Sequence, residues 1–275
     1  MEAKVSDSLR SLGFLAPEIR EVITQIRGAY AAWFGVTEDL SVLGTRILFA
    51  MKPRRTSHQE LLVAVLYGRC LAAHQTAIIL SERGLALEAR YVNRAMLEAV
   101  FAIVAVARVE GFADAYIKDD RHRHLRLINS YLNLPPDFIA AHGLDVDGLR
   151  TTAADLRAEL KAEGSQMLHV ADIAKKAEME GHYNSIYALL CLASHSNVRD
   201  FDRYLDIGSD GNVRGLRWGP SDHQVEDVLM QSCEFLFIAV RCAVDLFKVD
   251  AEKEIEALWA RYNSHIEKMP GALDV

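Results

Sequence analysis

Apolar residues recur every three or four positions along almost the whole chain, a spacing that predicts amphipathic helices. Short breaks such as Gly84, Gly111 and Pro135-Pro136 separate the periodic stretches. The pattern predicts an all-α protein, a single-domain helical bundle with one short irregular or hairpin insertion. The expected helices cover residues 17–33, 40–51, 57–82, 86–110, 112–133, 145–163, 169–180, 183–194, 222–249 and 251–269, and the insertion covers residues 206–221.

The boundaries of these segments give the expected organisation of the domain. N-terminal helices occupy residues 1–56, the core bundle 57–205 and 222–250, and a C-terminal helix with its tail 251–275. Ser57-x-x-Glu60 predicts a capping box, in which the hydroxyl and the carboxylate each accept a backbone N–H at the helix start. Asp210-Gly211 is a turn signal inside the insertion, which would carry Trp218 on a hairpin or flap.

One segment is apolar on every side. Residues 95–107 contain a single charge, Glu98, and a helix of this kind belongs in the centre of a core. Arg94 precedes Glu98 by four residues, on the same helical face, and is the expected partner. A buried Arg–Glu pair stabilises little. The pair therefore either fixes helix register or holds a guanidinium ready for an anion such as phosphate.

A second group of candidate residues follows the next apolar helix. His195 comes at the end of that helix among small polar residues, where it could serve as a general acid or base or cap a loop. Tyr183 and Tyr187 share one helical face and could line the same pocket, although tyrosines are also common in cores.

These two motifs resemble a bacterial helical family catalogued only as a domain of unknown function. The family carries an Arg-x-x-x-Glu step in an apolar helix, here Arg94 to Glu98, and a later helix with a tyrosine and then a histidine near its end, here Tyr187 and His195. A serine often stands four residues before that histidine, where this chain has Cys191.

The family in turn is similar to the HEPN superfamily, whose members are helical bundles, often dimeric, in toxins and phage-defence systems. Many are metal-independent ribonucleases with an arginine and a histidine separated by four to six intervening residues, and Arg69 and His74, with four residues between them, have that spacing. The resemblance implies a catalytic role for this pair. On an ideal helix, however, the two side chains point about 140° apart, and His74 also fits a polar stripe of a packed helix.

The long helix near the C-terminus repeats the pattern of charges in an apolar run. Arg241 and Asp245 are four residues apart and can pair, and Glu234 lies two turns earlier. If this helix packs on the central one, these charges would join Arg94 and Glu98 in one network, which would be core structure if sealed and a site if open. The expected ligand-binding residues are Tyr183, Tyr187, Arg241 and Trp218.

Composition narrows the function classes. The net charge of −7 argues against broad electrostatic binding to nucleic acid, although a local basic patch remains compatible with it. Four dispersed cysteines, the absence of a signal pattern and short apolar runs predict a cytoplasmic protein that does not enter a membrane. The sequence contains no metal-binding or nucleotide-binding motif, so we expect no metal and no cofactor.

Two hypotheses remain. The first is a metal-independent, RNA-acting effector of bacterial defence or toxin type, in which Arg94 or Arg69 holds the phosphate and His195 or His74 transfers protons, with Glu98 in the site. The second is a non-catalytic helical sensor or adaptor that binds a small anionic ligand or a partner protein. The resemblance also implies a homo-oligomer, and the sequence leaves open whether the protein is an enzyme.

Overall fold

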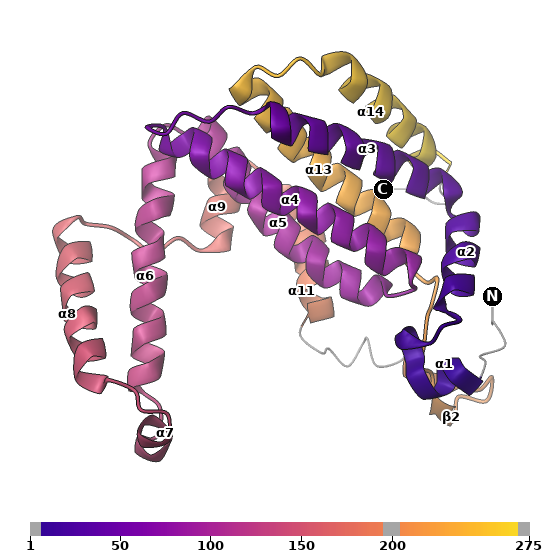
Figure 1. The fold of residues 1–275 in the computed structure, drawn as a ribbon, viewed down its shortest axis with the longest axis horizontal. Helices are drawn as coiled ribbons and strands as arrows, with labels where there is room; N and C mark the ends of the chain where they lie inside the picture. Colours follow the sequence, from indigo (N-terminus) through magenta and orange to yellow (C-terminus); the bar gives the residue numbers. More distant parts are fainter. Residues whose placement is uncertain (1–6, 195–203, 269–275) are drawn as a thin grey trace.

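The computed structural model describes residues 7–194 and 204–268 and confirms the all-α class (Figure 1). A small two-stranded sheet is the β-structure found within these ranges. The helical elements, in chain order, are α1 Asp7–Leu12, η1 Gly13–Leu15, α2 Ile19–Ala29, α3 Ala31–Ala50, α4 His58–Glu82, α5 Ala86–Arg108, α6 Phe112–Leu132, α7 Pro136–Ala141, α8 Val146–Ala162, α9 Val170–Lys176, α10 Glu180–His182, the π-helix η2 Tyr183–Tyr187, α11 Ala188–Ser194, α13 Val225–Phe247 and α14 Glu252–Ile266.

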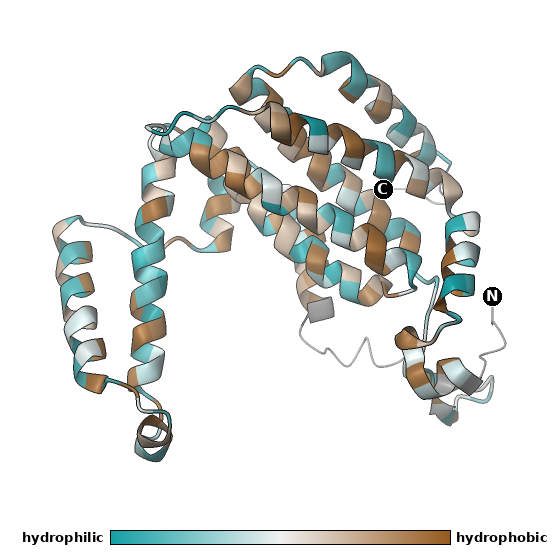
Figure 2. Ribbon diagram, viewed as in Figure 1, coloured by the Kyte–Doolittle hydropathy of each residue, from teal (hydrophilic) through white to brown (hydrophobic). Residues whose placement is uncertain are grey.

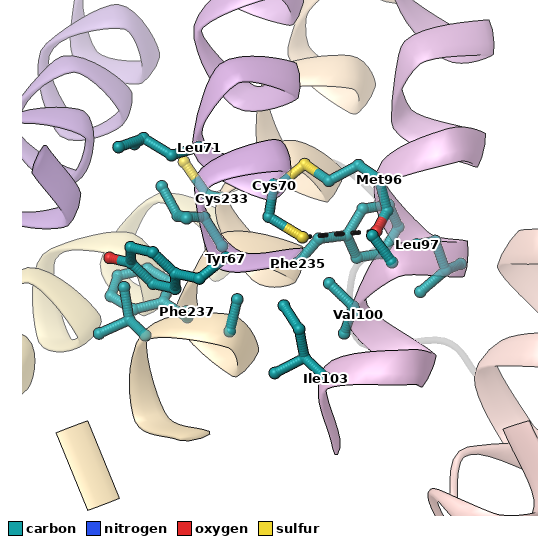
Figure 3. Close-up of a cluster of buried hydrophobic side chains, with 14 of the residues drawn as sticks. Tyr67, Cys70, Leu71, Met96, Leu97, Val100, Ile103, Cys233, Phe235 and Phe237 are labelled. Atoms are coloured by element: carbon teal, nitrogen blue, oxygen red, sulfur yellow. Dashed lines mark hydrogen bonds between the residues drawn. The ribbon is translucent and has the colours of Figure 1, made fainter. Parts of the chain in front are cut away.

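Helix α5 is the centre of the bundle, as its composition predicts. Every residue from Ala99 to Val106 is buried. The helix packs against α4 and α13 along its length, and α6, α9 and α11 cover further parts of its surface (Figures 1 and 2). Figure 3 shows apolar side chains of α4, α5 and α13 meeting in one cluster, with the Cys70 thiol 3.8 Å from the carbonyl oxygen of Met96.

A buried histidine connects α4 to two neighbouring helices. The Nε2 of His74 lies 3.0 Å from the carbonyl oxygen of Thr37 on α3. Its Nδ1 lies 2.8 Å from the hydroxyl and 3.3 Å from the carbonyl oxygen of Ser232 on α13. Because burial lowers the pKa of His74 to about 4, the imidazole is neutral at pH 7, with one ring nitrogen as donor and the other as acceptor. His74 has no exposed surface, so both hydrogen bonds lie within the core.

The capping box at the start of α4 is half confirmed. The Ser57 hydroxyl accepts from the backbone N–H of Glu60 at 3.3 Å, as expected. The Glu60 carboxylate, however, does not reach back to Ser57. It accepts from the backbone N–H and the Nε of Arg54, each at 2.7 Å, because the preceding loop folds back over the helix start. This contact orders part of the basic stretch between α3 and α4.

The helix boundaries near the N-terminus differ from the prediction. The expected break between residues 33 and 40 is absent, since α3 runs continuously from Ala31 to Ala50. The chain instead breaks at Tyr30, whose backbone leaves the helical region (φ −113°, ψ 29°). This turn reorients the chain so that Trp33 and Phe34 point into the core.

The predicted hairpin insertion is confirmed. Strands β1 Leu205–Ile207 and β2 Val213–Leu216 pair antiparallel with an irregularity beside Asp206, and Gly211 has the positive φ of 78° that the turn requires. Trp218 follows β2 and packs edge-on against Phe14, with ring centroids 5.8 Å apart.

Helices α6 and α8 form an antiparallel arm that stands beside the bundle (Figure 1). The arm is anchored at its base, where the buried carboxylate of Asp119 accepts from Arg123 and from the backbone N–H of Leu168, each at 2.7 Å. Beyond that point its interior is thin, and the buried apolar residues are Ile128, Ala153 and Leu160.

The His74 contacts predict a pH dependence of stability. Burial lowers the pKa of His74 to about 4, whereas an imidazole in the unfolded chain has a pKa of about 6.5. Between these values the unfolded state binds more protons, so the free energy of unfolding decreases as the pH falls, by at most about 1.4 kcal/mol per pH unit from this group. Urea denaturation of the wild type at pH 7.5, 6 and 5 would measure the decrease.

His74→Gln serves as the comparison because it removes the titrating group and keeps a polar side chain. We expect this variant to be less stable at pH 7.5 and to have a shallower pH dependence than the wild type. Equal pH dependence in the two proteins would contradict the assignment.

Candidate functional site

The candidate site lies where the π-helix and α11 cross α5. Helix α5 supplies Arg94 and Glu98, the π-helix supplies Tyr187, and α11 supplies Cys191. Arg94 Nη2 lies 3.1 Å from Glu98 Oε1, so the predicted pairing of these residues is confirmed. The Tyr187 hydroxyl lies between them, accepting from Arg94 Nη2 at 3.2 Å and donating to Glu98 Oε1 at 2.7 Å. The four residues form one hydrogen-bonded cluster.

The pair is not sealed in the core, which corrects the expectation from the sequence. The side chains of Arg94 and Glu98 remain 31% and 35% exposed. Most of α5 is covered by other helices on all sides, but the part of its surface that carries Arg94 and Glu98 is only partly covered by α11. The pair therefore avoids most of the desolvation cost of a buried ion pair and stays accessible to small solutes.

The donors of Arg94 are unequally used. Its Nε donates to the Cys191 sulfur at 3.2 Å, and its Nη2 is used by Tyr187 and Glu98. Nη1 has no hydrogen-bond partner among the described residues, and neither does the second carboxylate oxygen of Glu98. Among the described residues the guanidinium is thus held on one side, and the two N–H donors of Nη1 on the other side have no partner.

Tyr187 holds this arrangement in place. Its ring is buried, stacks on Tyr183 with centroids 5.1 Å apart, and contacts Phe101 edge-on at 6.0 Å. The Arg94 guanidinium also lies over the ring, 5.5 Å from its centroid. Burial, together with the hydrogen bond to Glu98, raises the pKa of the Tyr187 hydroxyl, which therefore stays protonated at neutral pH.

The stacked tyrosines mark the two ends of the π-helix. Tyr183 and Tyr187 are the first and last residues of η2, and their rings are nearly parallel, at 19°. Single π-turns are frequent at functional sites.

Two of the predicted ligand-binding residues lie elsewhere. Trp218 packs on Phe14 at the hairpin, and Arg241 hydrogen-bonds Glu252 of α14 rather than pairing with Asp245. Glu234 bonds His182 at 3.1 Å. The expected single network of α5 and α13 charges is therefore wrong, because Glu234 and Arg241 each find a partner on another segment, His182 and Glu252 respectively.

Arg69 and His74 do not form a joint site. Arg69 is exposed on α4, whereas His74 is enclosed between α3 and α13 with no accessible surface. The angular separation of the two positions on the helix explains why they face opposite environments. His74 is a structural residue and cannot contact a substrate in this structure.

Arg69 instead lies near the candidate site. Tyr116 on α6 is within electrostatic range of Arg69, Arg123 and Glu98. Burial raises the pKa of the Tyr116 hydroxyl, and the nearby Arg123 and Arg69 partly oppose that effect. Arg69 has no ion-pair partner within residues 7–194 and 204–268, and its positive charge is exposed on α4.

The remaining predicted residue, metal binding and the surface depression add no described residue to the cluster. His195 lies outside the described residues, and within those residues no three histidine, cysteine, aspartate or glutamate side chains are grouped so that they could hold a metal ion. A depression of about 450 Å³ lies at the junction of α4, α5 and α6, lined by Ser57, His58, Arg108 and Asp114 among others. It contains none of the predicted site residues.

The contact of Cys191 with Arg94 was missed by reasoning from the sequence. The sequence does place Tyr183, Tyr187 and Cys191 four residues apart, on one face of the helix, and this spacing could have indicated the contact. A cysteine in an apolar helix is, however, usually a packing residue.

Removal of the Tyr187 hydroxyl tests the cluster. Tyr187→Phe keeps the ring and leaves Arg94 Nη2 and Glu98 with one hydrogen bond fewer each, so we expect a loss of about 1 kcal/mol in the free energy of unfolding. Tyr183→Phe is the matched control, since that hydroxyl makes no hydrogen bond in the described structure, and should change little. Urea denaturation measures both, and equal losses would contradict the proposed role of the hydroxyl.

The comparisons with known proteins identify a family and no activity. No curated protein and no solved structure matches the chain. The profile described as "Family of unknown function (DUF5677)" matches residues 60–213, which is more than half of the chain and includes α4, α5, the π-helix and α11. The expected membership of a domain-of-unknown-function family is confirmed, and the chain belongs to DUF5677.

Proposed function

We propose that this protein is a helical sensor or adaptor that binds a small anionic group at Arg94. The observation that carries the proposal is the unequal use of the guanidinium, which is fixed through Nε and Nη2 while Nη1 has no partner in the described structure. A pre-positioned cation binds an anion without the entropy cost of ordering a long side chain.

The neighbours of Arg94 favour a ligand with two kinds of polar group. The Nη1 donors, which have no partner in the described part of the chain, suit a phosphate or carboxylate oxygen. The unpartnered oxygen of Glu98 is an acceptor, suited to a hydroxyl or amino group of the same ligand. A phosphate ester adjacent to a sugar hydroxyl combines these features.

Ligand binding can be tested by thermal unfolding with inorganic phosphate and with ribose 5-phosphate, each compared with chloride at equal ionic strength. We expect the phosphate compounds to raise the Tm of the wild type, since a ligand that binds only the folded state stabilises it. Arg94→Gln should abolish the increase, and Arg94→Lys should reduce it because an ammonium lacks the planar fork.

Arg241→Gln is the matched control, because Arg241 is also paired with a glutamate but lies outside the site. Its Tm should rise with phosphate as in the wild type. An increase that survives Arg94→Gln, or no increase in the wild type, would reject Arg94 as the binding group.

The RNA-acting effector remains the second candidate. Arg69, an exposed cation on the helix next to Arg94, favours it, because an extended polyanion could contact both arginines. In this reading Arg94 and Arg69 hold the backbone, Glu98 takes a proton from the ribose 2′-hydroxyl, and His195 protonates the leaving oxygen.

RNA cleavage separates the two candidates. If the effector hypothesis is correct, the purified wild type cleaves a mixed-sequence RNA without added metal, and Glu98→Gln and His195→Ala each lower the rate at least about 100-fold. His74→Gln tests the fold separately, since it should lower stability without removing a catalytic group. Intact RNA with the wild type, combined with phosphate binding, leaves the sensor or adaptor function.

A further inference from the structure

The depression at the junction of α4, α5 and α6 lies where the arm leaves the bundle (Figure 1). Its volume of about 450 Å³ is within the ~300–1,000 Å³ that is usual for small-molecule sites. The start of α4, the end of α5 and the first turn of α6 form its walls, and Val106, Val109 and Ala113 give these walls apolar surface. Neither Arg94 nor any residue bonded to it lines the depression.

Four ionisable side chains of both signs line the depression, and two of them are bonded to each other. The four are His58, Arg108, Glu110 and Asp114. His58 Nδ1 lies 2.7 Å from Asp114 Oδ1. Because a carboxylate can only accept, Nδ1 carries the proton, and Nε2 is an acceptor in the neutral ring. Nε2 has no hydrogen-bond partner among the described residues, so the ring is held by α6 through one nitrogen while the other stays available to a ligand.

The other two charges are not neutralised within residues 7–194 and 204–268. Arg108 and Glu110 are both exposed and stand two residues apart in the chain, yet neither forms an ion pair with the other or with another described residue. Arg108 does hydrogen-bond the thiol of Cys242 on α13, but a thiol is a weak acceptor and leaves the positive charge in place. A guanidinium and a carboxylate in one depression thus remain open to charged groups of a ligand.

The end of α5 contributes little to the acceptors of the depression. A helix leaves its last carbonyl groups without intrahelical partners. Here the Gln59 amide of α4 donates to the carbonyl oxygens of Val106 and Ala107, each at 3.0 Å. Two of these carbonyls are therefore satisfied by the protein itself, and the charged side chains determine which ligand fits.

We propose that this depression binds a small zwitterion of the amino-acid type. A purely anionic ligand would meet the carboxylates of Glu110 and Asp114, and a purely cationic ligand would meet the guanidinium of Arg108. A compact ligand that carries both charges is attracted by both sets of groups. The mixed lining therefore selects a zwitterion over either single ion.

The groups of an amino acid match the lining one by one. The planar fork of Arg108 suits the carboxylate of the ligand. The ammonium group has three donors, which suit the carboxylates of Asp114 and Glu110 and the Nε2 of His58. Apolar side-chain atoms of the ligand would contact the valines of α5 and of the link that follows it. Because these groups come from three helices, the bound ligand joins the base of the arm to the bundle.

Thermal unfolding of the full chain tests the proposal, with each standard amino acid as a probe at neutral pH and constant ionic strength. We expect at least one of them to raise the Tm of the wild type by about 2 °C or more, because a ligand that binds only the folded state stabilises it. Acetate and methylammonium each carry one of the two charges and should leave the Tm unchanged.

Two substitutions in the depression should each abolish the increase. Arg108→Gln removes the positive charge. Asp114→Asn removes a negative charge, although the amide oxygen can still accept from His58, and Asp114 is 64% exposed, so the variant should fold. Asp147→Asn and Arg150→Gln are the matched controls, because these residues form an exposed ion pair on α8 outside the depression. Both controls should keep the increase, and they also report any general stabilisation by amino acids as cosolutes.

The possible outcomes separate this site from the one at Arg94. Arg94→Gln should keep the response to the amino acid while it loses the response to phosphate. The proposal is overturned if no amino acid raises the Tm, if the increase survives either Arg108→Gln or Asp114→Asn, or if Arg94→Gln abolishes it. An increase with acetate alone that depends on Arg108 also overturns it, since the depression would then be an anion site.

Discussion

The structure depends on the burial of one helix from all sides. Residues 99–106 of α5 have no polar side chain, so each direction around the helix must be filled by another apolar surface. Helices α4 and α13 fill two of these directions, and α9 and α11 fill others with short segments. The candidate site lies at a place where this coverage is incomplete in the described structure, since Arg94 and Glu98 remain partly exposed beside α11.

Hydrogen bonds inside the bundle add specificity to this apolar packing. Dispersion and hydrophobic burial alone allow helices to slide or rotate relative to one another. His74 fixes α4 against Thr37 and Ser232, and the buried Asn93 of α5 donates to the carbonyl of Val228 on α13 at 3.0 Å. Each of these side chains has its partner at only one register of the helices, so they select one arrangement among many of similar apolar area.

The sequence predicted the features that depend on local patterns. The helix starting after Ser57, the central position of α5, the hairpin turn at Gly211 and the pairing of Arg94 with Glu98 all follow from periodicity or from spacing along one segment. The features it missed depend on contacts between distant segments. The Tyr187 hydroxyl is inserted between Arg94 and Glu98 by a π-turn, Glu60 turns to Arg54 because of the preceding loop, and Arg241 meets Glu252 only because α14 folds back on α13. No pattern within one helix contains this information.

The arm formed by α6 and α8 and the helical bundle can unfold as two separate cooperative units. The arm buries few apolar residues beyond its base, Ile128, Ala153 and Leu160, and its other contacts include exposed polar ones such as the hydrogen bond from Arg157 to Asn129. Such an element can open and reclose as a unit while the bundle stays folded, because no core residue of α5 depends on it. Changes in the length or composition of the distal half of the arm therefore leave the packing around α5 intact, and this half can diverge in sequence independently of the site.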